Sequence, residues 1–362
     1  MTKTPAAFCL LLTALLFQRL AFPPLACGYE PPIGGETLLL LGHPALTAGA
    51  ASTAGNLLWQ PFKQGGSSVG PAAITVNPAL TANNQRFTLD TGYTGLFQTE
   101  GDFAAAHYVH IGSLFPTRYG AFSAALRFNA GQVPALDLGQ AILAAAGFGR
   151  DITQNLYVGA AVSGGYNFNE TAGKSRNDWA LFAKIGFVYR LGDLGPLQES
   201  AVAVTVSQLG KPFGNGTSGW AYPSLATPQV GYSAIVLDET LIRGGFSVDL
   251  SFPIFQNLVL DAAIQIEIAR AVLVSVGYKI NIHETLCTDT MHLPFIGLSW
   301  NFTAGMGKSG VLVEQGWERS DIGISAVWDS LYGGAVQLIS AGAVLNMGGV
   351  NTAPPQILIE DR

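Results

Sequence analysis

The sequence predicts an all-β protein, a transmembrane antiparallel β-barrel of about fourteen strands. Three observations predict this fold: apolar and polar residues that alternate, few charges, and an N-terminal export segment. Successive strand side chains point to opposite faces, so an alternating run has one face for lipid and one for water. Over residues 257–268 the even positions are Leu258, Leu260, Ala262, Ile264, Ile266 and Ile268, and the odd positions include Asn257, Asp261, Gln265 and Glu267.

Fourteen such runs follow one another along the chain, with lengths that suit tilted strands of about ten residues. They cover residues 87–93, 108–115, 119–128, 137–148, 155–168, 178–191, 199–209, 228–237, 240–252, 257–268, 271–282, 294–302, 321–330 and 334–345. A fifteenth run, 310–314, is short, and we assign it to a loop because single-chain bacterial barrels have even strand numbers. Gly192-Asp193, Asp238-Glu239 and Pro253 predict turns, whereas 169–177 and 210–227 predict long outward loops.

The composition is consistent with a membrane barrel and excludes several other classes. Only 12% of the 362 residues are charged, yet no apolar stretch is long enough to cross a bilayer as a helix. The net charge of −6 argues against a nucleic-acid partner. The three cysteines, Cys9, Cys27 and Cys287, allow no disulfide framework and no paired metal site.

Residues 1–28 have the organisation of a secretory signal peptide. Lys3 precedes an apolar stretch, and Ala26 and Gly28 are small residues suited to cleavage before Tyr29. Lipidation is the alternative, because Leu25-Ala26-Cys27 loosely resembles a lipobox. Either way, the chain is expected to be exported to the outer membrane.

Five cations lie opposite the apolar positions of their runs and are therefore expected to face the barrel lumen: Arg127, Lys184, Arg190, Arg243 and Lys279. A charge on the lipid face near the midplane would cost roughly 2–4 kcal/mol. As a group they are candidates to bind the carboxylate of a ligand. The alternative is charge balance inside the barrel, with Asp249, Asp261 and Glu267 as partners.

Aromatic residues near the ends of several runs predict girdles at the two membrane interfaces. Examples are Trp179, Tyr189, Trp300 and Trp328.

Residues 29–86 do not alternate like the barrel runs, because glycine and proline interrupt them repeatedly. They nevertheless contain apolar triplets such as Leu57-Leu58-Trp59 and Ile74-Thr75-Val76, so we expect them to be packed inside the barrel as a hatch. Near the end of this segment stands Asn77-Pro78-Ala79. The side chain of Asn77 can form a hydrogen bond with the backbone ahead of it, and Pro78 suits the first position of a helical turn.

Asn77-Pro78-Ala79, followed by Arg86-Phe87, resembles the motif that closes the N-terminal hatch of the FadL-type long-chain fatty acid transporters. The likeness is to a spirochaete-like branch of that outer-membrane family. It implies a hatch at 29–86, a barrel at 87–347 and a C-terminal tail at 348–362. Barrels of this class usually finish on an aromatic residue, and this chain continues beyond that point. The family's ligand-contacting side chains cannot be placed on this sequence.

The resemblance implies passive uptake of long-chain fatty acids or other hydrophobic compounds by a monomer surrounded by outer-membrane lipids. Gly164-Gly165 and Gly244-Gly245 are candidates for a bulge or gap in the wall through which a ligand would leave. A host-interaction or structural barrel and a general porin are the alternatives, and a porin should lack the hatch.

An enzyme is the least expected class, and no cofactor or metal is expected. No GxSxG elbow or HExxH motif occurs in the sequence. His107 and His110 are close in sequence, and we interpret them as loop or strand-end residues.

Overall fold

The computed structural model describes residues 41–46, 52–57, 69–82, 84, 86–99, 101, 103–131, 133, 140–168, 170–171, 174–175, 177–214, 221–222, 226–288, 293–305 and 319–347. The predicted signal peptide at 1–28, the short run at 310–314 and the tail at 348–362 lie outside these residues. No helix in the described part is long and apolar enough to cross a membrane.

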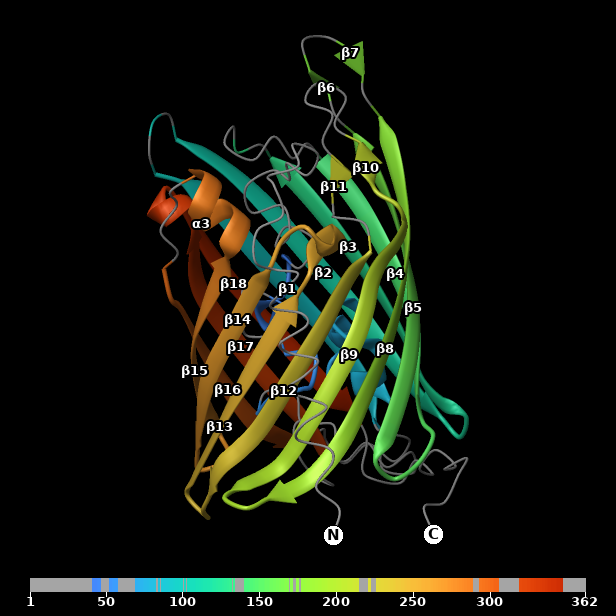
Figure 1. The fold of residues 1–362 in the computed structure, drawn as a ribbon, viewed down its shortest axis with the longest axis vertical. Coiled ribbons are helices and arrows are strands. Elements are labelled where there is room, and N and C mark those ends of the chain that lie inside the picture. Colours follow the sequence, from blue (N-terminus) through green and yellow to red (C-terminus); the bar gives the residue numbers. More distant parts are fainter. Residues whose placement is uncertain are drawn as a thin grey trace. The chain divides into compact units, whose positions relative to one another are not determined.

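Fourteen antiparallel strands form a closed barrel, which confirms the predicted fold (Figure 1). Each predicted run overlaps one of them. The barrel closes where β1 pairs with β18, from Phe87↔Met347 to Gln98↔Val336. The strands are β1 (Phe87–Gln98), β2 (Ala104–Thr117), β3 (Gly120–Gly131), β4 (Gln140–Asp151), β5 (Leu156–Phe168), β8 (Asp178–Leu194), β9 (Leu197–Lys211), β12 (Thr227–Asp238), β13 (Ile242–Ser251), β14 (Val259–Ile268), β15 (Val272–Asn281), β16 (Phe295–Gly305), β17 (Arg319–Leu331) and β18 (Val336–Met347).

Connections at one end of the barrel carry additional elements (Figure 1). Two short hairpins lie in the predicted long loops, and three helical turns follow in later connections. They are β6 (Glu170–Thr171) with β7 (Lys174–Ser175), β10 (Phe213–Gly214) with β11 (Ala221–Tyr222), η4 (Pro253–Phe255), α3 (Ile282–Thr288) and η5 (Tyr332–Gly334).

One predicted turn is wrong. Gly192-Asp193 lies inside β8, and the chain reverses at Gly195-Pro196 instead. The register between β8 and β9 shifts on both sides of Gly192, whose φ of 73° only glycine adopts readily. The glycine therefore serves a bulge within the strand pair, not the hairpin turn.

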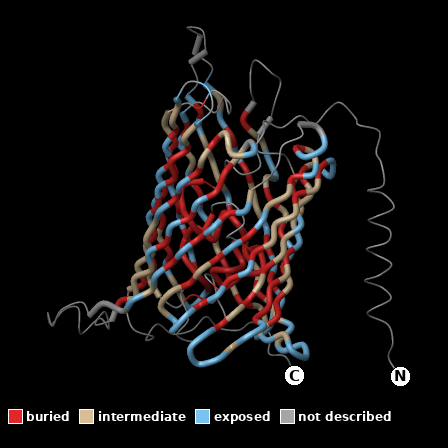
Figure 2. Tube along the Cα trace, turned by 90° about the vertical axis from the view of Figure 1, so that its left-hand side faces the viewer, coloured by how far each residue is buried: buried red, intermediate tan, exposed pale blue. Residues whose placement is uncertain are grey.

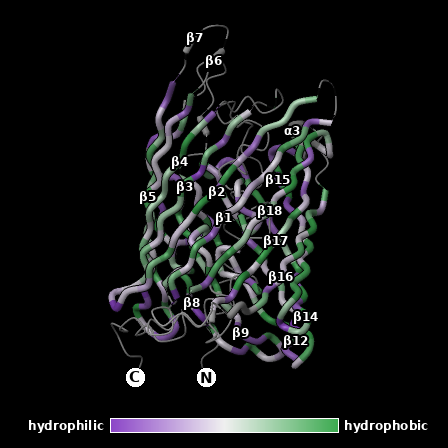
Figure 3. The backbone as a smooth tube through the Cα atoms, turned by 180° about the vertical axis from the view of Figure 1, so that it is seen from behind, coloured by the Kyte–Doolittle hydropathy of each residue, from purple (hydrophilic) through white to green (hydrophobic). Residues whose placement is uncertain are grey.

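Large apolar side chains are exposed at alternate positions of the barrel strands, as predicted. Hydrophobic and hydrophilic residues alternate along these strands (Figure 3). On β14, Ile264 is 65% exposed on the outside, whereas its neighbour Gln265 is 2% exposed on the inside. The predicted girdle residues are also exposed, and register divides them between two levels. Trp179 and Trp328 lie near the end that carries α3, whereas Tyr189 pairs with the first residue of β5 and Trp300 with the first residue of β15.

Three described pieces of the N-terminal segment lie against inward-facing residues of the barrel and are almost wholly buried (Figure 2). They contain three short helical turns, η1 (Pro44–Leu46), η2 (Pro71–Thr75) and η3 (Pro78–Thr81). Apolar residues of these turns share one core cluster with Tyr157 and Val188 of the wall. We call residues 41–46, 52–57 and 69–82 the inner segments.

Candidate functional site

Asn77 and Pro78 shape the last inner segment locally. Asn77 is the N-cap of η3: its Oδ1 accepts a hydrogen bond from the Ala79 amide at 3.0 Å, and Pro78 occupies the first helical position. The Asn77 amide also donates to the carbonyl of Thr53 at 2.7 Å and to that of Phe187 on β8 at 3.4 Å. One side chain thus joins two inner segments to the wall.

Three glycines on neighbouring strands form a bare strip beneath η3. Gly149 pairs with Gly159, and Gly159 pairs with Gly186, so the three lie in one cross-strand row on β4, β5 and β8. A Cβ atom at any of them would overlap η3 or Asn77. The backbone of the Asn77-Pro78-Ala79 turn can therefore approach the wall only because these side chains are absent.

Inward polar side chains of the wall hold the inner segments in place by accepting hydrogen bonds from their backbone amides. Asp249 on β13 accepts from Thr53 N at 3.0 Å and from Thr53 Oγ1 at 2.7 Å. Asp90 on β1 accepts from Ala72 N at 2.8 Å, and Gln265 on β14 accepts from Leu57 N at 2.7 Å. Asp249 therefore bonds a threonine and not one of the lumenal cations expected from the sequence.

Two buried histidines, His43 of the first inner segment and His110 of β2, contact each other. His110 Nε2 lies 2.9 Å from Asp90 Oδ1, and the rings of His110 and His43 have centroids 5.4 Å apart at 65°. Burial lowers the pKa of His43 to about 4, although the Asp90 carboxylate opposes that effect and His110 adds to it. His43 is therefore neutral near pH 7.

The prediction that His107 and His110 are loop or strand-end residues is wrong. Both lie well inside β2, and because they are three residues apart they face opposite sides. His107 is exposed and lies 2.6 Å from the Tyr93 hydroxyl, whereas His110 is buried beside Asp90. The inward position of Asp90 could be inferred from alternation, but its histidine partners could not.

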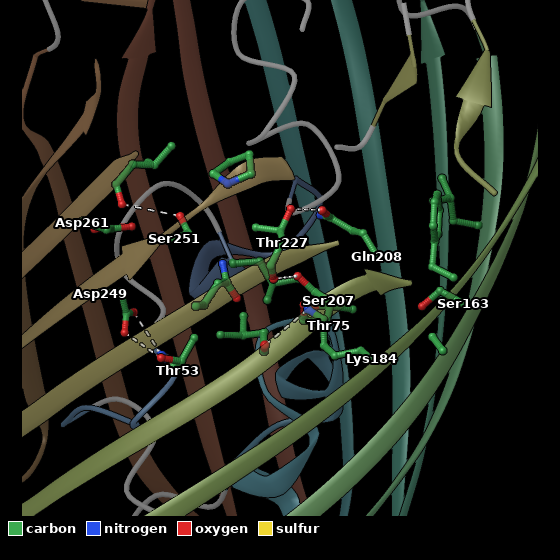
Figure 4. Close-up of a pocket in the computed structure, with 18 of the residues that line it drawn as sticks. Thr53, Thr75, Ser163, Lys184, Ser207, Gln208, Thr227, Asp249, Ser251 and Asp261 are labelled. Carbon is green, nitrogen blue, oxygen red and sulfur yellow. Dashed lines mark hydrogen bonds between the residues drawn. The ribbon is translucent and has the colours of Figure 1, made fainter. Parts of the chain in front are cut away.

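The lumen contains a cavity of about 110 Å³ above the inner segments. Its lining includes apolar atoms of Leu143, Phe182 and Val259. Its labelled polar side chains come from different parts of the wall (Figure 4). Asp249 and Asp261 lie on one side, Lys184 and Ser163 lie towards the other, and hydroxyl and amide groups of Ser207, Gln208 and Thr227 stand between them.

The cavity brings together three of the five predicted cations, namely Arg127, Lys184 and Lys279. Arg243 is elsewhere and is neutralised: its Nε lies 3.1 Å from Asp238 and its Nη1 lies 2.8 Å from Glu267. Arg190 does not line the cavity and interacts with the Tyr157 hydroxyl. The charge-balance alternative thus describes Arg243 and Glu267 well.

Lys184 and Arg127 both contact the inner segments. Lys184 Nζ donates to the carbonyls of Thr75 and Val76 at the end of η2. The aliphatic part of Arg127 lies beside Gly42. Two cations that line the cavity are therefore also in contact with the inner segments.

The register between neighbouring strands shifts at several places. One shift lies at the lumenal residue Lys184, and another lies opposite the predicted bulge site Gly244-Gly245. Between β8 and β9 the register shifts at Lys184, where Ser207 and Gln208 oppose one residue, and Gln208 has a φ of 61°. Between β12 and β13 the shift falls at Val236, opposite Gly244-Gly245, the pair expected to host a bulge. Gly164-Gly165 pairs in regular register with both neighbours, so the bulge expected there is absent.

The sequence matches no protein-family model, and no curated protein is similar to it in sequence. Solved structures do share its fold. The monoaromatic hydrocarbon channel TodX, as a deltaS2 mutant, has a TM-score of 0.54 and 10% identity over 87% of this chain and 99% of that one. The Pseudomonas putida toluene transporter TodX has a TM-score of 0.50 and 10% identity over 88% of this chain and 98% of that one.

A Pseudomonas aeruginosa FadL homologue is also similar, with a TM-score of 0.44 and 12% identity over 81% of this chain and 97% of that chain. At these identities the likeness to TodX is one of fold. The predicted architecture, a fourteen-stranded barrel, is confirmed at that level.

Proposed function

We propose that this chain is an outer-membrane channel for passive uptake of hydrophobic compounds, with the segment at 29–86 as its hatch. One observation carries the proposal: a closed barrel with an apolar outer surface holds inner segments in its lumen, next to a cavity lined by both apolar atoms and cations. Filling of the lumen by the inner segments supports this function over that of a general porin. Cation, hydroxyl and amide groups in the cavity would orient a ligand that is apolar elsewhere.

The TodX structures are named for a hydrocarbon channel and a toluene transporter, which supports hydrophobic ligands as the class. The resemblance of Asn77-Pro78-Ala79 supports long-chain fatty acids within that class. Transport and not catalysis is the role that we infer. Purified protein in vesicles should give saturable uptake of a labelled fatty acid. Vesicles without protein are the control, and uptake of neither a fatty acid nor toluene above that control would contradict the proposal.

The role of the cations is tested by comparing a fatty acid with its methyl ester. Arg127→Gln or Lys184→Gln should weaken binding of the acid but not of the ester, because only the acid gains charge-assisted hydrogen bonds. Arg190→Gln should change neither affinity. Arg243→Gln should lower stability instead, since it leaves Asp238 and Glu267 without their shared cation. Equal responses of acid and ester in all five variants, Lys279→Gln included, would assign the cations to charge balance alone.

A further inference from the structure

Arg127 differs from other inward cations of the described barrel in having no acceptor. It lies on β3, is 8% exposed, and lines the cavity. No carboxylate or carbonyl of the described chain is within hydrogen-bonding distance of its guanidinium. By contrast, Arg243 contacts two carboxylates.

A buried charge without a partner is costly, and proteins usually pair or remove it. Among the described residues, the contact of Arg127 with the inner segments is made by the carbons of its stem, which lie beside Gly42, and not by its guanidinium. Lys184 adds a second cation to the same cavity, and its described partners are neutral carbonyl groups. This side of the cavity therefore carries positive charge that no described acid neutralises.

The opposite side of the cavity carries two carboxylates, one of which, Asp261, pairs in register with Lys279. Asp249 and Asp261 face each other in register on β13 and β14, and both line the cavity. They would repel an anionic group and direct it towards Arg127 and Lys184. Apolar contact for the remainder of such a ligand is available from Leu143, which pairs with Arg127 in register, and from Phe182.

The size of the cavity limits what can fill it. Its volume of about 110 Å³ is of the same order as the roughly 150 Å³ cavity that admits benzene in an engineered protein. That space suits one ring or a short chain, whereas the tail of a long-chain fatty acid would have to extend beyond it. Resting on the proposed function, we propose that the cavity is a binding site for small organic anions of about one-ring size. Their carboxylate lies against Arg127 and Lys184.

Benzoate, benzamide and toluene are matched probes, since they share the ring and differ in charge and polarity. Binding of each to the full-length protein is measured by titration calorimetry, and passage of each is measured in proteoliposomes. Benzoate should bind at least tenfold more tightly than benzamide. Arg127→Gln should reduce that preference at least tenfold without changing the affinity for benzamide, and Arg127→Lys should retain part of it.

Arg118→Gln is the control, because Arg118 is exposed in the turn between β2 and β3 and should leave both affinities unchanged. Arg127→Gln should also fold at least as well as the parent, since no described partner is left unpaired. Equal binding of benzoate and benzamide, or a parallel loss of both in Arg127→Gln, would overturn the inference. If toluene or a fatty acid still passes in that case, the proposed function stands; if no probe passes, both fail.

Discussion

Several glycine residues of the barrel wall face the inner segments and allow their backbone to approach closely. At Gly159 a Cβ atom would overlap backbone atoms of Pro78 and Ala79, which cannot move independently of η3. We expect Gly159→Ala to lower the free energy of unfolding by about 1–3 kcal/mol and to expose the inner segments to protease. Gly164→Ala on the same strand is the control, because the nearest atoms would lie 3.9 Å from its Cβ. Equal protease sensitivity of the two variants would show that η3 does not depend on this contact.

His43 predicts a pH dependence for the docking of the first inner segment. Its pKa falls from 6.5 to about 4 on burial, so only the undocked form takes up a proton between these values. Docking is therefore fully stable above about pH 6.5 and weakens as the pH falls towards 4, by up to about 3 kcal/mol. Protease sensitivity of residues 41–46 should increase over this range in the parent and stay flat in His43→Gln. A parent that is equally flat would contradict the buried neutral imidazole.

The direction in which each strand side chain points was predictable from the sequence, whereas the partners of that side chain were not. Alternation correctly placed the inward cations and outward isoleucines because side-chain direction in a strand has a period of two. It did not separate Arg243, which has carboxylate partners, from Arg127, which has none, because partners depend on register between strands. The buried pair of His43 and His110 joins residues from the N-terminal segment and β2, and no local pattern reports such a contact.

At the scale of elements, each barrel strand should tolerate charge on one face only. Ile264 lies midway along β14 and is exposed on the outer surface, so Ile264→Arg should make the free energy of folding into lipid about 2–4 kcal/mol less favourable. Gln229→Arg on β12 places the same charge in the lumenal cavity and should change that free energy little. Urea titration in lipid vesicles measures both variants. Similar losses would mean that the register of β14 is wrong.

The strands and the inner turns differ in how far sequence determines them. All fourteen runs became strands, since alternation over ten residues reports burial of one face directly. The turn at Gly192 was misplaced because glycine signals both turns and bulges. The turns η1, η2 and η3 are too short for periodicity, and side chains and bare glycines of the wall hold them in place. Only η3 had a local signal, the Asn77-Pro78 cap.

For the whole molecule, the barrel and the inner segments have separate sources of stability. The barrel is closed by backbone pairing between strands in residues 87–347, which does not involve the N-terminal segment. The inner segments depend on the wall, through acceptors such as Asp90, Asp249 and Gln265. A barrel without them should therefore still fold, whereas the isolated segments should not.

Deletion of residues 29–75 tests this asymmetry together with the proposed hatch. It removes η1, the Thr53 anchor and all of η2, but it keeps Asn77 and every strand. The shortened chain should refold with the heat-modifiable gel mobility of the parent, and its conductance to small ions in planar bilayers should rise because the lumen has lost its filling. Asp249→Ala removes the acceptor of Thr53 but leaves the inner segments in the chain, so it should give a smaller rise. A deleted chain that folds but conducts like the parent would exclude residues 29–75 as the barrier in the lumen. A chain that fails to fold would show that the inner segments are part of the barrel's own stability.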